Sequence, residues 1–552
     1  MITQGATDVP VSESWDYVVI GGGSAGGVVA ARLAEDNSAS VLLLDAGAPA
    51  RARLLRVPGA VDRIIGNPRF DWRYASEPDA SRRGKPIRWS AGKVLGGGSS
   101  INGLVFSRGL ACDFDDWRTQ GCPGWSAAEV LPFFERLEHF EQPERSTRGA
   151  SGPLGVEFNR YRPAILDAYL DACREAGIPI VDDVNGFPLQ GIGRAQASTW
   201  RGVRQSTTVT YLRLPRRNLE IRSEALATAV LIEGSRCTGV RYRRGTASGA
   251  ASGATECLAR ARRATVLCAG TFGSPKLLML SGIGPPELLR HHGIGVVHAL
   301  PGVGLNLHDH PAVYESLGVR LPTVTARDQQ GLAALLHGLR WWLRGDGIAA
   351  GAAMIATGFV RSDVTQSAPD LYLQLAPFAI RSEAGGKLVF SREPAITTIV
   401  SVSHPQSRGS VEITSADPAA PLRSTLELLG DASDRQRLVA ALRLIRRIHH
   451  MAALQRHARA VEDIPGIAAL DGSDAALLEY AAANCGGQYH AVGTCRMGSE
   501  ALAVVDPKLQ VRGIANLYVA DASVMPSITS ANTNAPVLMI GERAAQFIRT
   551  AT

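Results

Sequence analysis

The stretch WDYVVIGGGSAGGVVAARLAED, residues 15–36, decides the fold of this chain. Its first six residues are mostly apolar or aromatic and predict a strand, which runs directly into three consecutive glycines at 21–23. The residues after this turn predict a helix, and a second strand, Val41–Leu44, ends on Asp45. Strand, glycine-rich turn, helix and strand in this order are typical of a dinucleotide-binding α/β unit.

The glycines of the turn have separate expected roles. Gly21 permits the tight turn, Gly23 lets a pyrophosphate approach the backbone closely, and Gly26 lets the helix pack against the strand. The pyrophosphate then lies against the N–H groups of Ser24 and Ala25, where the helix begins. A glycine-rich turn that binds nothing is the alternative, and the presence of every part of the pattern disfavours it.

Asp45 lies roughly 20 residues beyond the last glycine of the pattern, where an acid is expected to accept hydrogen bonds from a ribose diol. An acid at this position argues against a 2′-phosphate. The pattern therefore predicts FAD or NAD as the ligand and disfavours NADP.

Length and composition indicate a two-domain enzyme. The chain has 552 residues, of which 45% are hydrophobic, and this exceeds what one domain uses. The net charge of +7 comes from dispersed arginines, without a basic block interleaved with aromatic residues. We therefore expect no nucleic acid partner.

The cysteines and the N-terminus favour a cytoplasmic protein. The 8 cysteines are scattered and form no CxxC pair, a pattern typical of reduced thiols. The first residues show no signal-peptide pattern, and no run of about 18 apolar residues predicts a transmembrane segment.

Two further stretches admit more than one interpretation. Gly331–Arg344 is an amphipathic helix that fits the core, a lid over a substrate entrance, or an interfacial membrane helix; core or lid is favoured, and peripheral membrane contact is not indicated. His308, Asp309 and His310 resemble a metal cluster, but no further ligands follow at the spacing of closed zinc sites. A structural turn is the favoured interpretation, and no metal site is expected.

The strand pattern and the last helix complete the prediction. Residues 219–268 alternate with the period of strands and predict an antiparallel meander.

Near the C-terminus, His490 lies in the glycine-bounded segment GGQYHAVGTCRMG and is a candidate reactive residue. A final helix is expected over residues 536–549, with Pro536 in its first turn.

Several long motifs closely resemble the glucose–methanol–choline oxidoreductases, nearest to the choline dehydrogenase and hydroxymethylfurfural oxidase-like branch. They are GKVLGGGSSINGLVFSRG (92–109), GTFGSPKLLMLSGIG (270–284), YHAVGTCRMG (489–498), DASVMP (521–526) and NTNAP (532–536). The resemblance extends from about residue 16 to residue 548.

The resemblance implies an α/β fold, α+β overall, with two discontinuous domains. A Rossmann-like FAD-binding domain is expected from residues 1–160, 216–310 and 484–552. A substrate-binding domain, containing a large antiparallel sheet that covers the flavin, is expected from residues 161–215 and 311–483.

The resemblance also implies which residues bind the cofactor. The expected set is Gly21, Gly23, Ser24, Ala25, Gly26, Asp45, Ala46, Gly98, Ser99, Asn102, Gly103, Leu104, Val105, Ala227, Ala269, Tyr489, Asp521, Ala522, Asn532 and Thr533. Some members of the family attach FAD through a histidine in the GGGSS loop. That position is Ile101 here, so non-covalent FAD is expected.

His490 matches the catalytic histidine of the family and Asn532 its His-or-Asn partner. The expected reaction is oxidation of a primary or secondary alcohol, in which a hydride moves to flavin N5 and a neutral imidazole accepts the hydroxyl proton. The electron acceptor is dioxygen, a quinone or an artificial acceptor. The alternatives are a hydroxynitrile lyase-like enzyme, a flavin-dependent photodecarboxylase that His490 argues against, and a flavin-binding protein without turnover.

Overall fold

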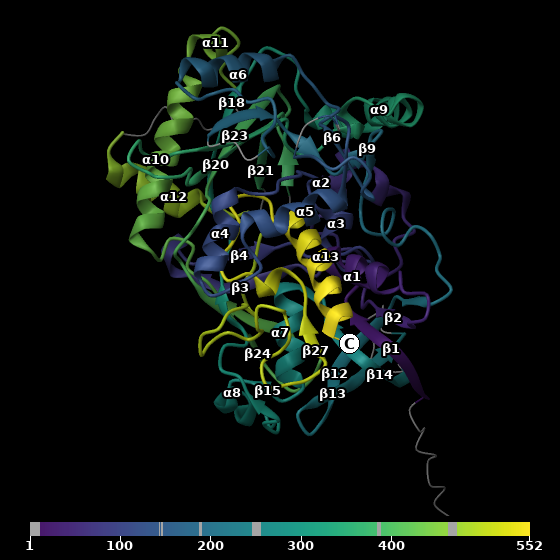
Figure 1. The fold of residues 1–552 in the computed structure, drawn as a ribbon. Helices are drawn as coiled ribbons and strands as arrows, with labels where there is room; N and C mark the ends of the chain where they lie inside the picture. Colours follow the sequence, from purple (N-terminus) through teal and green to yellow (C-terminus); the bar gives the residue numbers. More distant parts are fainter. Residues whose placement is uncertain are drawn as a thin grey trace, which may run out of the picture.

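The structure is a computed structural model that describes residues 11–142, 144, 147–186, 190–245, 255–382, 388–461 and 472–551. The expectation about a signal peptide falls mainly on residues 1–10, which lie outside the described residues. Figure 1 shows the strands β18, β20 and β23 in the upper half and β1, β12, β13, β14 and β27 in the lower half. Helix α13 runs through the middle of the same view.

The first sheet contains the predicted dinucleotide-binding unit. Its path is β11 (Leu219–Arg222), β2 (Val41–Leu44), β1 (Val11–Ile20), β14 (Thr255–Leu267), β13 (Arg236–Arg244) and β12 (Ala225–Glu233), with β27 (Leu517–Val519) also paired to β14. The strands β11, β2, β1, β14 and β27 pair in parallel. Helix α1 (Ser24–Leu33) connects β1 to β2, so the order predicted from the glycine-rich stretch is confirmed.

The predicted meander over residues 219–268 is wrong in two respects. Strand β11 pairs in parallel with β2, and only β12, β13 and β14 are antiparallel to their neighbours in this stretch. Strand β14, over Thr255–Leu267, also pairs in parallel with β1, which lies outside the predicted meander. An alternating pattern shows that a segment is extended, but the partner of the segment depends on the whole sheet.

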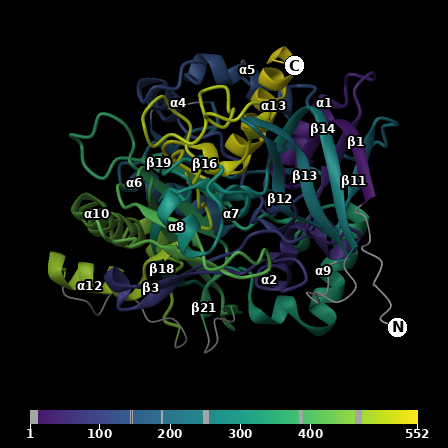
Figure 2. The same ribbon diagram turned by 90° about the horizontal axis from the view of Figure 1, so that it is seen from below.

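The second sheet is antiparallel throughout, as the resemblance implied. Its order is β26 (Gly486–Gly487), β18 (Pro311–Gly318), β23 (Ala395–Val402), β20 (Leu371–Ala376), β19 (Ala356–Val360) and β7 (Gly191–Arg194). Helix α10 (Ala432–His449) packs against β18 and β23, and α6 (Ile165–Glu175) packs against α10. Figure 2 shows α6, α10 and α12 (Asp474–Asn484) on the side away from β1 and β14.

Two hydrophobic cores accompany the two sheets. One is built mainly from residues 17–44, 106–158, 211–303 and 492–548, and the other mainly from residues 165–192 and 307–485. Most of the first group lies in the segments proposed for the FAD-binding domain and most of the second in those proposed for the substrate-binding domain, but Tyr211 and Leu212 of segment 161–215 belong to the first core, and the domain division stays a prediction. The short strand β26 lies just beyond the proposed boundary at residue 484 and pairs with the second sheet.

Two helices matter for the sections below. The last helix, α13 (Asn534–Ala551), begins two residues before the predicted start and packs along α1. Helix α9 (Gly331–Arg344) has the predicted bounds, but none of its residues is buried. The interpretation of this segment as part of the core is therefore wrong. No helix in the described part of the chain combines the length and the apolar character required to cross a membrane.

Candidate active site

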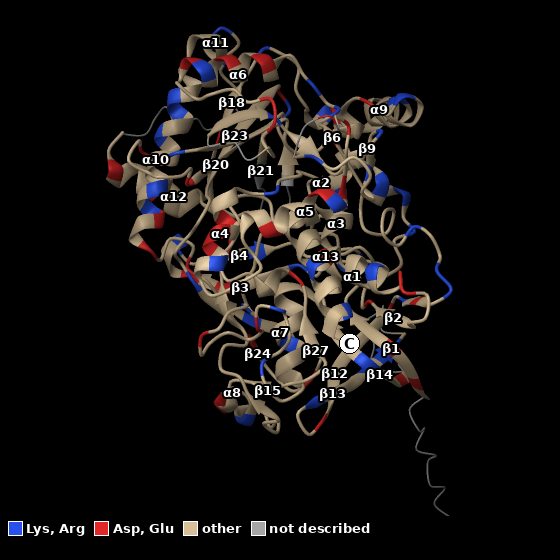
Figure 3. Cartoon of the chain, viewed as in Figure 1, with Lys and Arg blue, Asp and Glu red and all other residues tan. Residues whose placement is uncertain are grey.

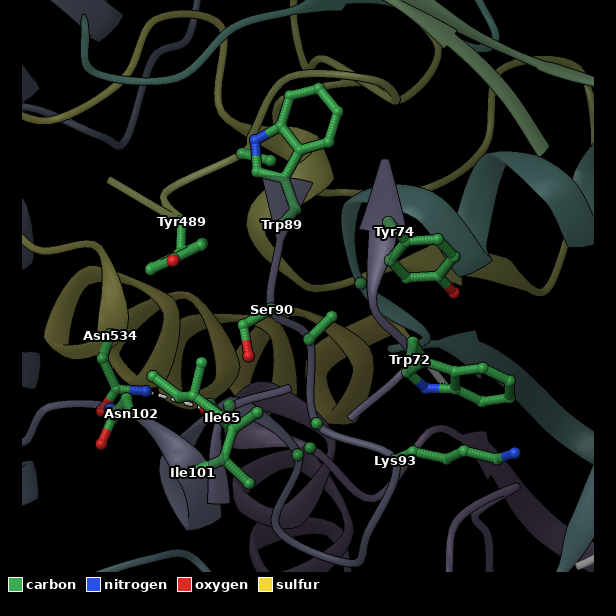
Figure 4. A pocket seen from close by; sticks show the side chains of 18 of the residues that line it. Ile65, Trp72, Tyr74, Trp89, Ser90, Lys93, Ile101, Asn102, Tyr489 and Asn534 are labelled. Carbon is green, nitrogen blue, oxygen red and sulfur yellow. Dashed lines mark hydrogen bonds between the residues drawn. The ribbon is translucent and has the colours of Figure 1, made fainter. Parts of the chain in front are cut away.

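A cavity of about 1110 Å³ is lined by residues of both sheets. Asp45 and Ala227 border it from the first sheet, and Gln374 and Ile399 border it from the second. It is also lined by Gly21, Gly23, Ser24, Ala25, Ala46, Gly98, Asn102, Gly103, Leu104, Val105, Ala269, Tyr489, His490, Asp521, Ala522, Asn532 and Thr533. Figure 4 shows side chains from segments far apart in the sequence around this space, among them Trp72, Ile101, Tyr489 and Asn534. Most of the residues that the sequence predicted to bind the cofactor therefore line this one cavity.

Gly26 and Ser99 are the two residues of the expected cofactor-binding set that do not line the cavity. They stabilise the segments that do. A Cβ atom on Gly26 would lie 1.8 Å from the carbonyl oxygen of Gly21, so α1 and the end of β1 touch where only glycine fits. The Ser99 hydroxyl donates to the Gly96 carbonyl oxygen at 2.6 Å and accepts from the Thr207 N–H at 3.1 Å. Both residues hold the glycine-rich loops in place.

The two glycine-rich loops contact each other. The Gly96 N–H donates to the carbonyl oxygen of Gly22 at 2.7 Å. A Cβ atom on Gly97, whose φ is +50°, would lie 2.7 Å from the Cα atom of Gly23. Gly23 precedes α1 and offers no side-chain cap, and the first turn of α1 contains no acid. The N–H groups that begin α1 therefore remain suited to an anionic ligand in the cavity.

Asp45 lies at the end of β2 with its carboxylate beside the first glycine-rich turn. Its Oδ2 accepts from the Gly22 N–H and its Oδ1 from the Gly47 N–H, both at 2.7 Å. Burial raises the pKa of this carboxyl, while the two N–H donors oppose the rise. Each carboxylate oxygen has a further lone pair, so the group can accept from a ligand as well.

The hydrogen bonds around His490 define its tautomer. His310 Nε2 lies 3.1 Å from the Ser403 carbonyl oxygen and 2.9 Å from that of Thr529, and since carbonyls only accept, this nitrogen carries a hydrogen. The Nδ1 of neutral His310 is then an acceptor, 2.9 Å from His490 Nδ1. His490 therefore donates from Nδ1, and its Nε2 is the unprotonated nitrogen.

Burial keeps both imidazoles neutral. It lowers the pKa of His490 to about 3 and that of His310 well below the usual range, where the neighbouring His490 lowers it further. A neutral imidazole with an unprotonated ring nitrogen is a proton acceptor at neutral pH. The sequence alone could not show that His490 is held in this state.

Asn532 is oriented toward His490 by a partner from the second sheet. The Tyr372 hydroxyl donates to Asn532 Oδ1 at 3.0 Å, so the amide nitrogen of Asn532 faces His490 Nε2, at 2.9 Å. His490 and Asn532 both line the cavity. An oxygen atom of a ligand placed beside them meets an acceptor nitrogen and an amide donor together.

The predicted turn at His308, Asp309 and His310 also supports the site, which the sequence analysis missed. Asp309 Oδ1 accepts from the backbone N–H of His490 at 3.0 Å, and its Oδ2 accepts from the Trp89 indole at 2.9 Å. Asp309, His310 and His490 lie close enough together to suggest a metal site, but hydrogen bonds occupy the atoms that would bind a metal. The histidine-rich triplet was the available signal, and its spacing gave no indication of His490 as its partner.

Two residues that line the cavity have strained backbone. Leu104 has φ +69° and Tyr489 has φ +61°, conformations that residues with side chains rarely adopt. Such strain persists only where surrounding contacts enforce it, and it gathers at functional sites. Both residues belong to the motifs from which the sequence analysis inferred cofactor binding.

Comparison with known proteins decides the family. A family model described as GMC oxidoreductase matches residues 15–312 and 405–541. The chain belongs to the GMC oxidoreductase family. It is thus an FAD-dependent oxidoreductase acting on CH–OH donors.

Individual relatives of this GMC oxidoreductase cover nearly its whole length. The oxygen-dependent choline dehydrogenase of Photobacterium profundum is 36% identical, over 98% of this chain and 93% of its own. An uncharacterised GMC-type oxidoreductase of Mycobacterium tuberculosis is 39% identical, over 97% of this chain and 99% of its own.

Solved structures give the same picture. Pyridoxine 4-oxidase from Mesorbium loti is 27% identical, has a TM-score of 0.84 and covers 96% of this chain and 98% of its own. A formate oxidase variant of Aspergillus oryzae is 24% identical, has a TM-score of 0.88 and covers 98% of this chain and 99% of its own. At this identity the likeness shows only that the fold is shared.

The residues of the cavity fit FAD. The uncapped start of α1 suits a pyrophosphate, and Asp45 suits a ribose. Asp521 also borders the cavity, but its carboxylate accepts from the Gly270 N–H at 2.9 Å and the Ser274 hydroxyl at 2.6 Å. This carboxylate fixes the start of α7 (Gly270–Leu280), so any contact of Asp521 with the cofactor is expected through its backbone.

Replacing Asp45 with alanine is expected to weaken FAD binding by about 1–3 kcal/mol, because a charged acceptor of ribose hydroxyls is lost. Titration of apoprotein with FAD measures this change. Asp363→Ala is the matched control, since Asp363 Oδ1 also accepts from a backbone N–H two residues later but is exposed. Equal FAD affinity in both variants would show that Asp45 is not the ribose ligand.

Proposed function

We propose that this protein oxidises a neutral alcohol with an apolar or aromatic substituent at non-covalently bound FAD, with His490 as the proton acceptor. The observation that carries the proposal is the hydrogen-bond chain from Ser403 and Thr529 through His310, which leaves His490 Nε2 unprotonated beside Asn532. Bound FAD supplies the hydride acceptor, N5 of its isoalloxazine ring.

The residues of the chain bind the alcohol and move its proton. The hydroxyl group donates to His490 Nε2, which accepts the proton as the C–H bond breaks. Asn532 donates its amide N–H to the same oxygen and fixes the direction of that C–H bond without changing its own charge. Because Tyr372 holds the amide of Asn532, this donor is oriented before the substrate arrives.

The first turn of α13 forms part of the cavity wall. Asn534 and Val537 line the cavity, and the Asn534 amide donates to the Ser24 hydroxyl at 2.8 Å. The N-terminus of a helix favours negative charge within its first turn. Pro536 lies in this turn, as predicted.

The second sheet and the adjoining loops form an apolar wall that favours the proposed substrate class. The residues are Val324, Met354, Pro377, Phe378, Ile380, Phe390 and Ile399. Gln374 interrupts this wall; it is 1% exposed, and its Nε2 has no hydrogen-bond partner among the described residues. A substrate with an apolar group and one acceptor near Gln374 satisfies both features.

The mode of FAD attachment gives a direct test. Acid or heat precipitation of the yellow protein is expected to release FAD into the supernatant, because Ile101 occupies the position at which some members of the family carry a tethering histidine and has no nucleophilic atom. Absorbance of the supernatant measures the release. Flavin that stays with the precipitate would contradict non-covalent binding.

Anaerobic mixing with a panel of alcohols tests the reaction. Bleaching of the flavin by benzyl-type or longer alkyl alcohols, and weaker bleaching by choline, is the expected result. Admission of air, or of a quinone, then identifies the electron acceptor by the return of colour. A protein that no alcohol bleaches, but that cleaves a cyanohydrin, would instead be a lyase on this fold.

A further inference from the structure

The apolar side of helix α9 points away from the protein. Its large apolar side chains, each 47–74% exposed, are Leu332, Leu335, Leu336, Leu339, Trp342 and Leu343. They recur at intervals of three and four residues and therefore share one face of the helix. Figure 1 shows α9 at the edge of the molecule.

The opposite face attaches the helix to the body through polar contacts. The Trp341 indole donates to the Gly202 carbonyl oxygen at 2.6 Å, and His337 contacts Asp328 at 3.0 Å. A surface helix of a globular protein ordinarily buries its apolar face and exposes its polar one. In α9 the apolar face is exposed instead, and the described residues do not cover it.

The charges around the exposed face are predominantly basic. Arg340, Arg344 and Arg160 all lower the pKa of Asp346, with Arg340 contributing most through its hydrogen bond. Arg63 donates to the Gln329 carbonyl oxygen at 2.8 Å, just before the helix begins. Figure 3 shows α9 largely in tan, with basic residues in blue at one end. Asp346, which is half-buried, therefore lies among several arginines and bonds to Arg340.

Residues that flank the helix on both sides line the active-site cavity. Gln329 lies two residues before α9, Ile348 lies four residues after it, and both line the cavity. The two ends of α9 are therefore joined to this wall of the cavity.

We propose that α9 is an interfacial helix that docks the protein on a membrane surface containing anionic lipid. The five leucines and Trp342 enter the boundary between headgroups and acyl chains, while Arg340 and Arg344 contact lipid phosphates. A second copy of the chain fits this face less well, because α9 contains no acid that could pair with Arg340 and Arg344 of the other copy. The inference does not depend on the proposed function.

Vesicle sedimentation of the FAD-loaded protein tests the proposal. Binding is expected to vesicles of phosphatidylcholine mixed with phosphatidylglycerol, and to be weaker for phosphatidylcholine alone. The double variant Leu335→Gln/Leu339→Gln is expected to reduce the partition coefficient at least about tenfold, because two apolar anchors are lost. Arg344→Gln is expected to reduce binding to the anionic vesicles alone, by about fivefold.

Val364→Gln is the matched control, since Val364 is 90% exposed but lies outside α9. This variant is expected to bind vesicles like the unaltered protein. Equal binding by the double leucine variant would overturn the proposal, as would the absence of binding to either vesicle. A dimer in sedimentation velocity that dissociates in the double leucine variant would assign the face to a second copy instead.

Discussion

Replacing His490 with alanine is expected to slow flavin reduction by about 10² to 10⁴ while FAD stays bound. The variant loses the nitrogen that accepts the hydroxyl proton, but it leaves the glycine-rich loops and Asp45 unchanged. Stopped-flow absorbance with an alcohol identified in the panel measures the rate. His450→Ala, which removes an exposed histidine at the end of α10, is the control and should reduce its flavin normally.

The pH dependence follows from the burial of His490. Flavin reduction requires the neutral imidazole, so its rate is expected to rise with pH through the pKa of His490 and to be constant above it. Burial lowers this pKa to about 3, so the rise lies on the acidic side of the usual histidine range and the rate is flat near neutrality. His490→Ala should lose this ionisation.

Asn532→Ala should cost less than His490→Ala, because an orienting hydrogen bond contributes less than the proton acceptor. The two effects should not add fully in the double variant, since both residues act on one oxygen. Flavin reduction at the unaltered rate in His490→Ala would show that another group accepts the proton.

Gly26→Ala is expected to destabilise the protein by about 3 kcal/mol, the upper end for overpacking, and to yield protein depleted in FAD. The new Cβ atom would lie 1.8 Å from the Gly21 carbonyl oxygen and 2.9 Å from the Cβ atom of Cys268. The backbone at Gly26 and the backbone at Gly21 cannot move apart without separating α1 from the end of β1. The helix propensity of alanine offsets only about 1 kcal/mol of this cost.

Denaturant unfolding and the flavin content of the purified variant measure the effect. Gly338→Ala is the matched control, because Gly338 also lies within a helix but a Cβ atom there would meet nothing within 4 Å. This control is expected to gain up to about 1 kcal/mol of stability. Gly26→Ala with the stability and flavin content of the control would refute the close packing of α1.

The sequence by itself determined the parts of this protein that depend on local chemistry. The turn at Gly21 requires a positive φ, +100° in the structure, which only glycine adopts freely, and the apolar run before it could only be a buried strand. Strand β2 was therefore predicted with its observed bounds, Val41–Leu44. His490 and Asn532 could be proposed as the catalytic pair because each lies in a motif that is contiguous in the sequence.

The tertiary structure decided what depends on partners distant in the sequence. His310 lies 180 residues before His490, and only folding shows that it sets which nitrogen of His490 is free. Strand β11 has the same alternating pattern whether its neighbour is β2 or β12. The stripe of leucines on α9 is likewise the same whether it faces the core or the solvent, because periodicity defines a face of a helix but not the direction in which that face points.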